Sequence, residues 1–394
     1  MSPIVRACPI RSLSGGKCTL SGTLTVGENA DLGTGTTSGY ANFSKITFKN
    51  GSRFILKATS GSLNAKTDVE FDGSVGISVN GGGSVENPPL LSIDGNVSGS
   101  GTISLTDQGG IAFLGTNNTY SGTIKSTNTS AGDVPQRLQI GSGAKFSWGT
   151  GTLETKRVRA CVVLNADSNL VFAASITGPG RLVKQGKGVL TLGNPPDRTG
   201  AIAAGLYAYE IENGGIVLGG EVPAKMEGLI KLSSASSSFD VGGRADVTYL
   251  PEGAGKMLST GGSSLILRGG WTNDVVFSGS LTCPAAVELL DGTVWRMTEQ
   301  TSLAGDLEVR SGTAVMGAFF ATTNAVTVDE TAVLKFNSDE FWRRRDLTGL
   351  LVDFWDIESL CYAVGSSHEA RLDAALEKAE SDPPMYSTDM TEFA

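Results

Sequence analysis

Histidine, charged residues and long apolar runs are all scarce in this sequence. His368 is the only histidine, and 18% of the 394 residues are charged. A Ser-His-Asp triad, a Cys-His pair or a two-histidine metal site would have to be built around that one residue, which argues against each of them. No stretch of about 18 uncharged apolar residues occurs, so the sequence predicts no membrane-spanning helix.

The cysteines are few and widely spaced. Cys8, Cys18, Cys161, Cys283 and Cys361 include no CxxC pair, which argues against a structural zinc site and a dense disulfide framework. Cys8 and Cys18 are close enough in sequence to form one N-terminal disulfide; alternatively, most of the five serve as small apolar residues. The sequence indicates no metal site and no cofactor.

Positive charge is also limited, because the formal net charge is −9. A protein that displaces counterions from phosphates needs clustered Lys and Arg, so nucleic acid is not an expected partner. Residues 337–394 hold 13 acidic and 5 basic residues, and only two of the 53 glycines. We therefore predict a boundary near Phe336, with an N-terminal cap (1–20), a body (21–336) and an acidic helical tail (337–394) that caps the body or mediates interactions.

What the body does contain is short runs of alternating apolar and polar residues separated by turn signals. Such runs occupy residues 23–26, 45–48, 53–56, 75–79 and 102–105. This alternation is typical of strands. Turn dipeptides such as Asn50-Gly51 and Asp72-Gly73 follow too soon for the long strands of a barrel. The absence of a helical period between the runs argues against a doubly wound sheet.

Two blocks of the body resemble each other. One begins at Gly99 (GSGTISLTDQGGIAFLGT) and the other at Gly178 (GPGRLVKQGKGVLTLGN), with matching glycine and apolar positions nearly throughout. A repeated strand-turn unit cannot bury its apolar side alone and must stack on its neighbours. The body is therefore expected to be a solenoid.

These blocks resemble the autotransporter-associated β-strand repeat. The second block matches it at Gly178, Gly180, Leu182, Lys184, Gly186, Gly188, Leu190, Thr191, Leu192, Gly193 and Asn194. The first keeps Gly99, Gly101, Ile103, Gly110, Leu114, Asn118, Tyr120 and Gly122 but lacks the lysine. The resemblance implies the passenger region of a secreted bacterial surface protein. Such proteins usually end in a membrane-embedded β-barrel, whereas no segment after Gly317 has the length and alternation of one.

The resemblance and the strand pattern together predict an all-β fold. We expect a right-handed parallel β-helix with ~20–25 residues per coil and a small α-helical C-terminal appendage. Leu347, Leu350, Leu351, Phe354, Ile357 and Cys361 fall on one face of the expected tail helix. The open edges at the two ends of a solenoid invite pairing with another chain unless they are capped.

Candidate interaction residues lie in the tail, where large aromatic residues and arginines gather. Trp, Tyr and Arg are enriched at interface hot spots. The candidates are Phe341, Trp342, Arg343, Arg344, Phe354, Trp355, Tyr386 and Phe393. In the alternative interpretation, the aromatics seal the last coil and the arginines pair with acids of the tail. The final segment could add as a strand to a neighbour's edge or lack fixed structure.

A catalytic groove would need a row of carboxylates on one sheet, as in β-helix enzymes that act on polysaccharides. The spacing of Asp274, Asp291 and Asp306 is less than a regular coil. The sequence therefore predicts no catalytic residues.

The function expected from these observations is structural. We predict a non-enzymatic extracellular or bacterial cell-surface protein that is a subunit of a fibre or filament, or an adhesin. Its expected partners are further copies of itself, arranged head to tail, or a glycan or protein of a cell surface or host. Two alternatives stay open: a phage tail fibre or tailspike located in the virion, and a polysaccharide-degrading β-helix enzyme.

Overall fold

Short strands separated by turns make up the part of the chain described by this computed structural model. The structure describes residues 23–336 and Ala363–Val364, except residues 30, 35–42, 57–59, 64–66, 80–87, 108, 128–135, 158–159, 194–207, 220–225, 243–246, 261–263, 270–273, 290–292, 299–300 and 317–324. These described residues contain 35 strands and no helix. The chain divides into two compact units, Met1–Gly242 (unit 1) and Gly243–Ala394 (unit 2).

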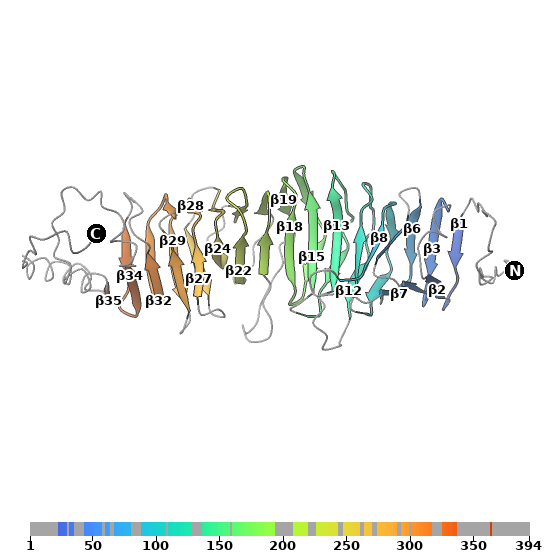
Figure 1. Cartoon of the computed structure of the whole chain (residues 1–394), viewed down its shortest axis with the longest axis horizontal. Coiled ribbons are helices and arrows are strands. Elements are labelled where there is room, and N and C mark those ends of the chain that lie inside the picture. The colour runs from blue at the N-terminus through green and yellow to red at the C-terminus, as the bar shows by residue number, and fades with distance from the viewer. Residues whose placement is uncertain are drawn as a thin grey trace, which may run out of the picture. The chain divides into compact units, whose positions relative to one another are not determined.

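In unit 1, successive strands of each coil belong to different sheets, and each strand pairs with its counterpart one coil away (Figure 1). One sheet contains β1 (Thr23–Val26), β3 (Lys45–Lys49), β6 (Asp68–Asp72) and β9 (Val97–Gly99). A second contains β2 (Asp31–Thr34), β4 (Arg53–Leu56), β7 (Ser74–Val79), β10 (Thr102–Leu105), β12 (Thr123–Ser126), β14 (Thr152–Glu154) and β17 (Ser175–Thr177).

The third sheet of unit 1 is the longest. It contains β5 (Ser60–Leu63), β8 (Leu90–Ile93), β11 (Gly110–Phe113), β13 (Arg137–Gly143), β15 (Cys161–Ala166), β18 (Arg181–Gln185), β20 (Ala208–Ile211) and β22 (Met226–Leu232). A further sheet joins β16 (Leu170–Phe172), β19 (Val189–Leu192), β21 (Gly215–Leu218) and β23 (Ser238–Asp240).

Unit 2 repeats this arrangement. One sheet contains β24 (Val247–Gly253), β27 (Asp274–Phe277), β30 (Val294–Met297), the second half of β32 (Leu307–Met316) and β34 (Ala332–Phe336). The groove sheet, as we call the next, contains β26 (Leu265–Gly269), β29 (Ala285–Leu289), the first half of β32 and β33 (Val326–Val328). The third contains β25 (Lys256–Leu258), β28 (Ser280–Leu281) and β31 (Ser302–Leu303).

The pairing of these strands is parallel, as the repeat predicts. Thr23 pairs with Lys45 and Cys161 pairs with Arg181, and both intervals fall within the expected coil length. The interval from Ser60 to its partner Leu90 is longer than the expected coil. The predicted all-β parallel solenoid is confirmed, and the coils vary in length because their turns do.

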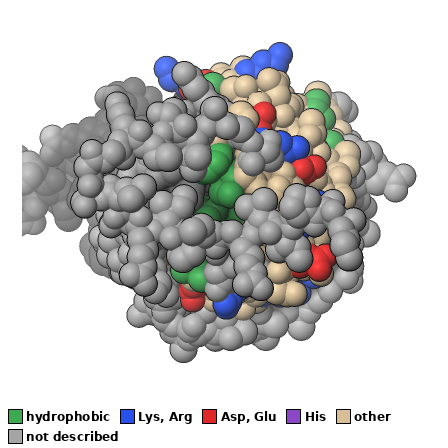
Figure 2. Space-filling view, turned by 90° about the vertical axis from the view of Figure 1, so that its right-hand side faces the viewer, with side chains coloured by type: hydrophobic (Ala, Val, Ile, Leu, Met, Phe, Trp, Pro, Cys, Tyr) green, Lys and Arg blue, Asp and Glu red, His purple; other side chains and the backbone are tan. Residues whose placement is uncertain are grey.

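Alternation along each strand sends every second side chain into the coil. In β7 and β8 the inward positions are buried and those between them are less so. Aromatic rings stack from coil to coil inside unit 1: the ring centroids of Phe48 and Phe71 lie 5.5 Å apart. In the end-on view of Figure 2, hydrophobic side chains gather at the centre and charged ones at the periphery. The apolar interior supplies the main driving force for stacking.

Glycine is required where the coil turns against the coil before it. Gly178 has a φ of +98°, a conformation that side chains other than hydrogen disfavour. A Cβ atom there would overlap the carbonyl oxygen of Thr155, and one at Gly101 would overlap that of Gly73. Two glycines shared by the repeated blocks thus mark close backbone approaches.

The two repeated blocks do not occupy equivalent places in the coil. After Gly99 and Gly101 the chain enters β10 in the second sheet of unit 1, whereas after Gly178 and Gly180 it enters β18 in the third. The repeat therefore encodes a strand-turn-strand unit and not a fixed position in the coil.

Both ends of the chain lie largely outside the described residues. This holds for the predicted N-terminal cap, for Cys8, Cys18 and His368, and for the expected tail helix, which all stay predictions. Within the tail, β35 (Ala363–Val364) pairs antiparallel with β34, placing Ala363 opposite Leu334. A tail segment therefore pairs along β34.

Candidate functional site

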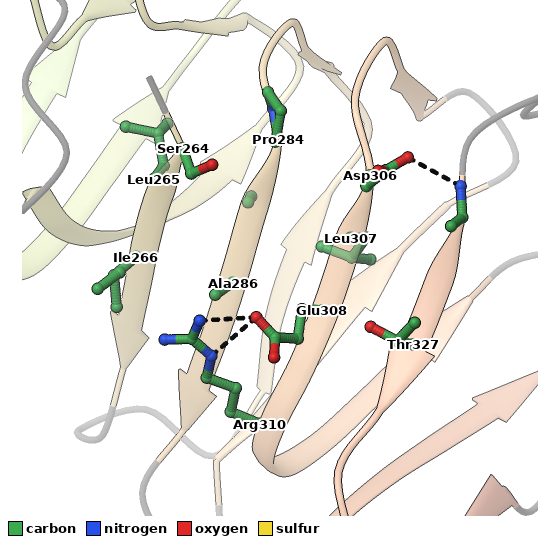
Figure 3. A pocket seen from close by; sticks show the side chains of 12 residues that line it. Ser264, Leu265, Ile266, Pro284, Ala286, Asp306, Leu307, Glu308, Arg310 and Thr327 are labelled. Atoms are coloured by element: carbon green, nitrogen blue, oxygen red, sulfur yellow. Dashed lines mark hydrogen bonds and ion pairs between the residues drawn. The ribbon is translucent and has the colours of Figure 1, made fainter. Parts of the chain in front are cut away.

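A shallow, open hollow lies on the outer side of the groove sheet in unit 2. Its volume is about 410 Å³, and it lies over β26, β29, β32 and β33 (Figure 3). We call it the lateral groove. It is lined by Ser264, Leu265, Ile266, Pro284, Ala285, Ala286, Asp306, Leu307, Glu308, Arg310, Ala325 and Thr327.

One short side chain in an outward row accounts for the lateral groove. Ile266, Ala286, Glu308 and Thr327 occupy the same register position on four successive strands. These positions point outward, because their neighbours Leu265, Leu267, Leu307 and Val309 are buried in the coil. Ala286 is much shorter than the residues on either side of it, so the row is hollowed at β29.

A ladder of alternating charges borders the lateral groove. Arg268 Nε lies 2.6 Å from a carboxylate oxygen of Glu288, and the other oxygen of Glu288 lies 3.2 Å from Arg310 Nη1. Arg310 also reaches Glu308 at 2.7 Å, as Figure 3 shows. A β-bulge in the pairing of β29 with β32 sets this geometry, since Glu288 lies opposite Ser311 instead of Arg310.

The ion pairs shift the acid-base balance of two of these groups. Burial raises the pKa of Glu288, but the hydrogen bonds and charges of Arg268 and Arg310 together lower it by more. The pKa of Glu288 therefore lies below its ordinary value. The bond to Glu308 raises the pKa of Arg310 despite partial burial. Glu288 and Arg310 are therefore both charged at neutral pH.

Other polar groups of the lateral groove remain open to solvent. Asp306 is exposed, and its Oδ1 accepts a hydrogen bond from the backbone N–H of Ala325 at 2.9 Å. The hydroxyls of Ser264 and Thr327 lie on exposed residues. The groove thus combines an apolar floor with carboxylate, guanidinium and hydroxyl groups at its margins.

In unit 1, a lysine occupies a position that is otherwise apolar. Lys184 is fully buried and pairs in register with Leu164 and Ile211 on the neighbouring coils. Its Nζ donates hydrogen bonds to the carbonyl oxygens of Ala166, Gln185 and Gly186 at 3.2, 2.6 and 2.7 Å. Burial lowers the pKa of Lys184 to about 8, with a smaller opposing effect from Asp167.

This geometry gives Lys184 a structural part. Its stem fills the apolar row, and its ammonium group satisfies three carbonyls at the corner after β18. Leu105 stands at the matching position of the first repeated block and is also buried. The lysine that distinguishes the second block therefore stabilises the turn after β18 and does not lie on the surface.

The tail residues predicted to mediate interactions stay predictions. Phe341, Trp342, Arg343, Arg344, Phe354, Trp355, Tyr386 and Phe393 all lie outside the described residues. Cys161 and Cys283 are buried in the coils, consistent with their use as small apolar side chains.

The three aspartates considered for a catalytic row are not brought together. Asp274 belongs to β27 and pairs with Arg296 at 2.8 Å, whereas Asp306 precedes β32 at the groove sheet. Asp291 lies outside the described residues. Within the part of the chain that the structure describes, no three His, Cys, Asp or Glu side chains are grouped to hold a metal ion, and no helix could cross a membrane.

Sequence reasoning missed Arg268, Glu288, Glu308 and Arg310. The available signal was their spacing, because Arg268, Glu288 and Arg310 follow one another at intervals of about one coil. Charges of opposite sign one coil apart are expected to meet on a parallel solenoid, but only the register identifies which of them do.

Comparison with known proteins found no match to this chain among protein families, curated protein sequences or solved structures.

Proposed function

We propose that this protein is a non-enzymatic structural protein located outside a bacterial cell, as a subunit of a surface fibre or filament, or as an adhesin. The observation that carries the proposal is that charged side chains on the outer faces pair with each other from one coil to the next. Such pairs are Lys45–Glu70 (2.9 Å), Lys49–Asp72 (2.5 Å), Arg181–Glu210 (2.7 Å), Arg268–Glu288 (2.6 Å) and Arg296–Asp274 (2.8 Å).

These pairs favour a structural use of the outer faces. Each bridges two adjacent strands of one sheet, so it fixes the register of one coil on the next. Charges engaged in this way are less available as the acid and base of a hydrolase, which need pKa values matched to proton transfer. The resemblance to the autotransporter-associated repeat supports a place outside the cell.

Head-to-tail association is the expected mode of assembly. Parallel strands at the ends of a solenoid present unpaired backbone groups that another chain can extend. A contact between unlike ends produces an open filament and not a closed ring. The pairing of β35 with β34 supports a role for the tail at such an edge. The tail would either cover the edge of its own chain or pair with the edge of another copy.

The test is negative-stain electron microscopy and mass photometry of the full chain over a concentration series. We expect filaments with a regular axial repeat that lengthen as concentration rises, and loss of filaments when residues 337–394 are deleted. Particles of monomer mass at every concentration would rule out the filament and leave the adhesin as the proposed function. A trimeric mass would support a virion fibre instead, and cleavage of a polysaccharide would overturn the non-enzymatic function.

A further inference from the structure

We propose that the lateral groove of unit 2 binds a neutral saccharide chain through its apolar floor and its carboxylate and hydroxyl margins. This inference rests on the adhesive form of the proposed function and names the ligand class and the site. It uses the residues that line the groove in Figure 3.

The shape of the lateral groove suits an extended ligand. Its lining comes from four neighbouring strands, β26, β29, β32 and β33, so the groove crosses the strands. Neighbouring strands lie ~4.8 Å apart, so a ligand that lies across them meets a new strand at regular intervals. A linear chain of sugar rings can contact several strands at once.

The floor provides the apolar contact that one face of a sugar ring needs. Ile266, Pro284 and Ala286 are apolar lining residues, and the short side chain of Ala286 lies in register with that of Ile266. Ligand sites are mostly apolar surfaces with a few well-placed polar groups. The C–H face of a pyranose ring can pack on such a floor while its hydroxyls point toward the margins.

The margins provide both hydrogen-bond donors and hydrogen-bond acceptors. Asp306 and Glu308 present carboxylate acceptors for ligand hydroxyls, and bonds to a charged acceptor are stronger than neutral ones. Ser264 and Thr327 can donate or accept. The ring oxygens and hydroxyls of a saccharide match this mixture, whereas a purely apolar ligand would leave the polar margin without partners.

The charge balance selects a neutral chain over an anionic one. Both guanidinium groups at the groove, those of Arg268 and Arg310, already pair with Glu288 and Glu308. Asp306 adds a third carboxylate, so carboxylates outnumber guanidinium groups. A uronic-acid chain would meet this excess negative charge and would have to displace a carboxylate from each arginine. A neutral chain leaves the ladder intact.

The experiment measures binding of named sugars to the full-length protein by isothermal titration calorimetry. The probes are cellohexaose, mannohexaose and maltohexaose, with polygalacturonate as the acidic comparison. We expect at least one neutral hexasaccharide to bind at millimolar concentration or below, and polygalacturonate to bind at least tenfold more weakly. No heat from any neutral hexasaccharide at millimolar concentration would overturn the proposal.

Two groove variants locate the site. Ala286→Trp fills the floor, and Thr327→Trp obstructs the exposed margin; each is expected to weaken binding at least tenfold. Val276→Trp is the matched control, because Val276 is 44% exposed on β27, in a different sheet of the same unit. It should bind as the unsubstituted chain does. Equal binding by all three variants would place the saccharide elsewhere and refute the groove.

A fourth variant tests the polar margin. Glu308→Gln keeps the size of the side chain but removes its charge, and should reduce binding severalfold while circular dichroism stays unchanged. Unchanged binding by E308Q and T327W would contradict the recognition described above. Chain length of the sugar after incubation separates the two proposals: shortened sugar overturns the non-enzymatic function and leaves the binding site, whereas intact sugar without binding overturns only the site.

Discussion

Trp295 and Arg296 are neighbours in β30 and show how differently the two sides of the coil wall are built. Trp295 is fully buried, stacks on Phe277 with ring centroids 5.9 Å apart and donates from Nε1 to the carbonyl of Pro251 at 3.1 Å. The Arg296 side chain is 45% exposed and pairs with Asp274. We infer that the inward side determines whether the coils stack, and the outward side determines what the surface can bind.

The largest effect is expected from emptying the interior. Trp295→Ala removes a large buried ring together with its hydrogen bond, and should lower the free energy of unfolding by about 3–5 kcal/mol. Urea titration followed by circular dichroism measures this. Arg296→Ala, one residue away, is the matched control; equal losses from the two variants would remove the distinction between the two sides.

Next in size is the close approach at a corner. Gly178→Ala places a methyl group on the Thr155 carbonyl oxygen in a backbone conformation with φ of +98°, and should cost about 2–3 kcal/mol. At Gly193 the nearest atom to an added Cβ is 3.5 Å away, so Gly193→Ala should be nearly neutral. Similar thermal stability of the two variants would show that the corner adjusts freely.

Lys184 sharpens the comparison because it is a polar group on the inward side. Lys184→Met keeps the apolar stem but leaves the carbonyls of Ala166, Gln185 and Gly186 without the ammonium donor. The expected loss is about 1–3 kcal/mol near neutral pH, measured by urea titration. A variant as stable as the unsubstituted chain would mean that water replaces the amine.

The same lysine predicts a pH dependence. Its pKa is lowered from 10.5 in the unfolded chain to about 8 in the fold, so between these values the unfolded chain binds more protons. Stability contributed at this site should therefore rise as pH increases from about 8 toward 10.5. The melting temperature of the unsubstituted chain minus that of K184M should therefore increase over that range. A value that stays constant or falls with pH would contradict the lowered pKa.

The smallest effect is expected on the outward side. Arg296→Ala breaks an exposed ion pair with Asp274 and should change the free energy of unfolding by less than about 1 kcal/mol, an effect that added salt reduces further. Urea titrations at low and high salt measure this. A loss comparable to that of Trp295→Ala would show that cross-coil pairs carry the stacking.

Much of the fold was accessible from sequence because alternation within a strand is a local signal. The runs at residues 23–26, 45–48 and 53–56 coincide with β1, β3 and β4. The glycine positions shared by the two blocks were also visible in the sequence, whereas the close approach of Gly101 and Gly178 to neighbouring backbone is seen only in the structure. Coil length was less accessible, because loops between strands can lengthen without altering the strand pattern.

The lateral groove was not accessible in the same way. Ala286 and Glu308 are ordinary residues of two short strands, and nothing local to either of them indicates a hollow. They become neighbours only through the register that aligns β29 with β32, including the bulge that sets Glu288 opposite Ser311. A shift of one residue would turn these side chains to the other side of the sheet.

The sequence by itself determined that the chain forms short stacked strands with an apolar interior, because alternation and glycine turns act within a few residues. The tertiary structure decided which coil positions the repeated blocks occupy, that Lys184 turns inward to three carbonyls, and that outward charges meet in pairs. These features depend on contacts between residues on neighbouring coils, such as Cys161 with Arg181 and Ser60 with Leu90. Which residues align depends on the number of residues in the coil between them, and that number is set by the folded loops.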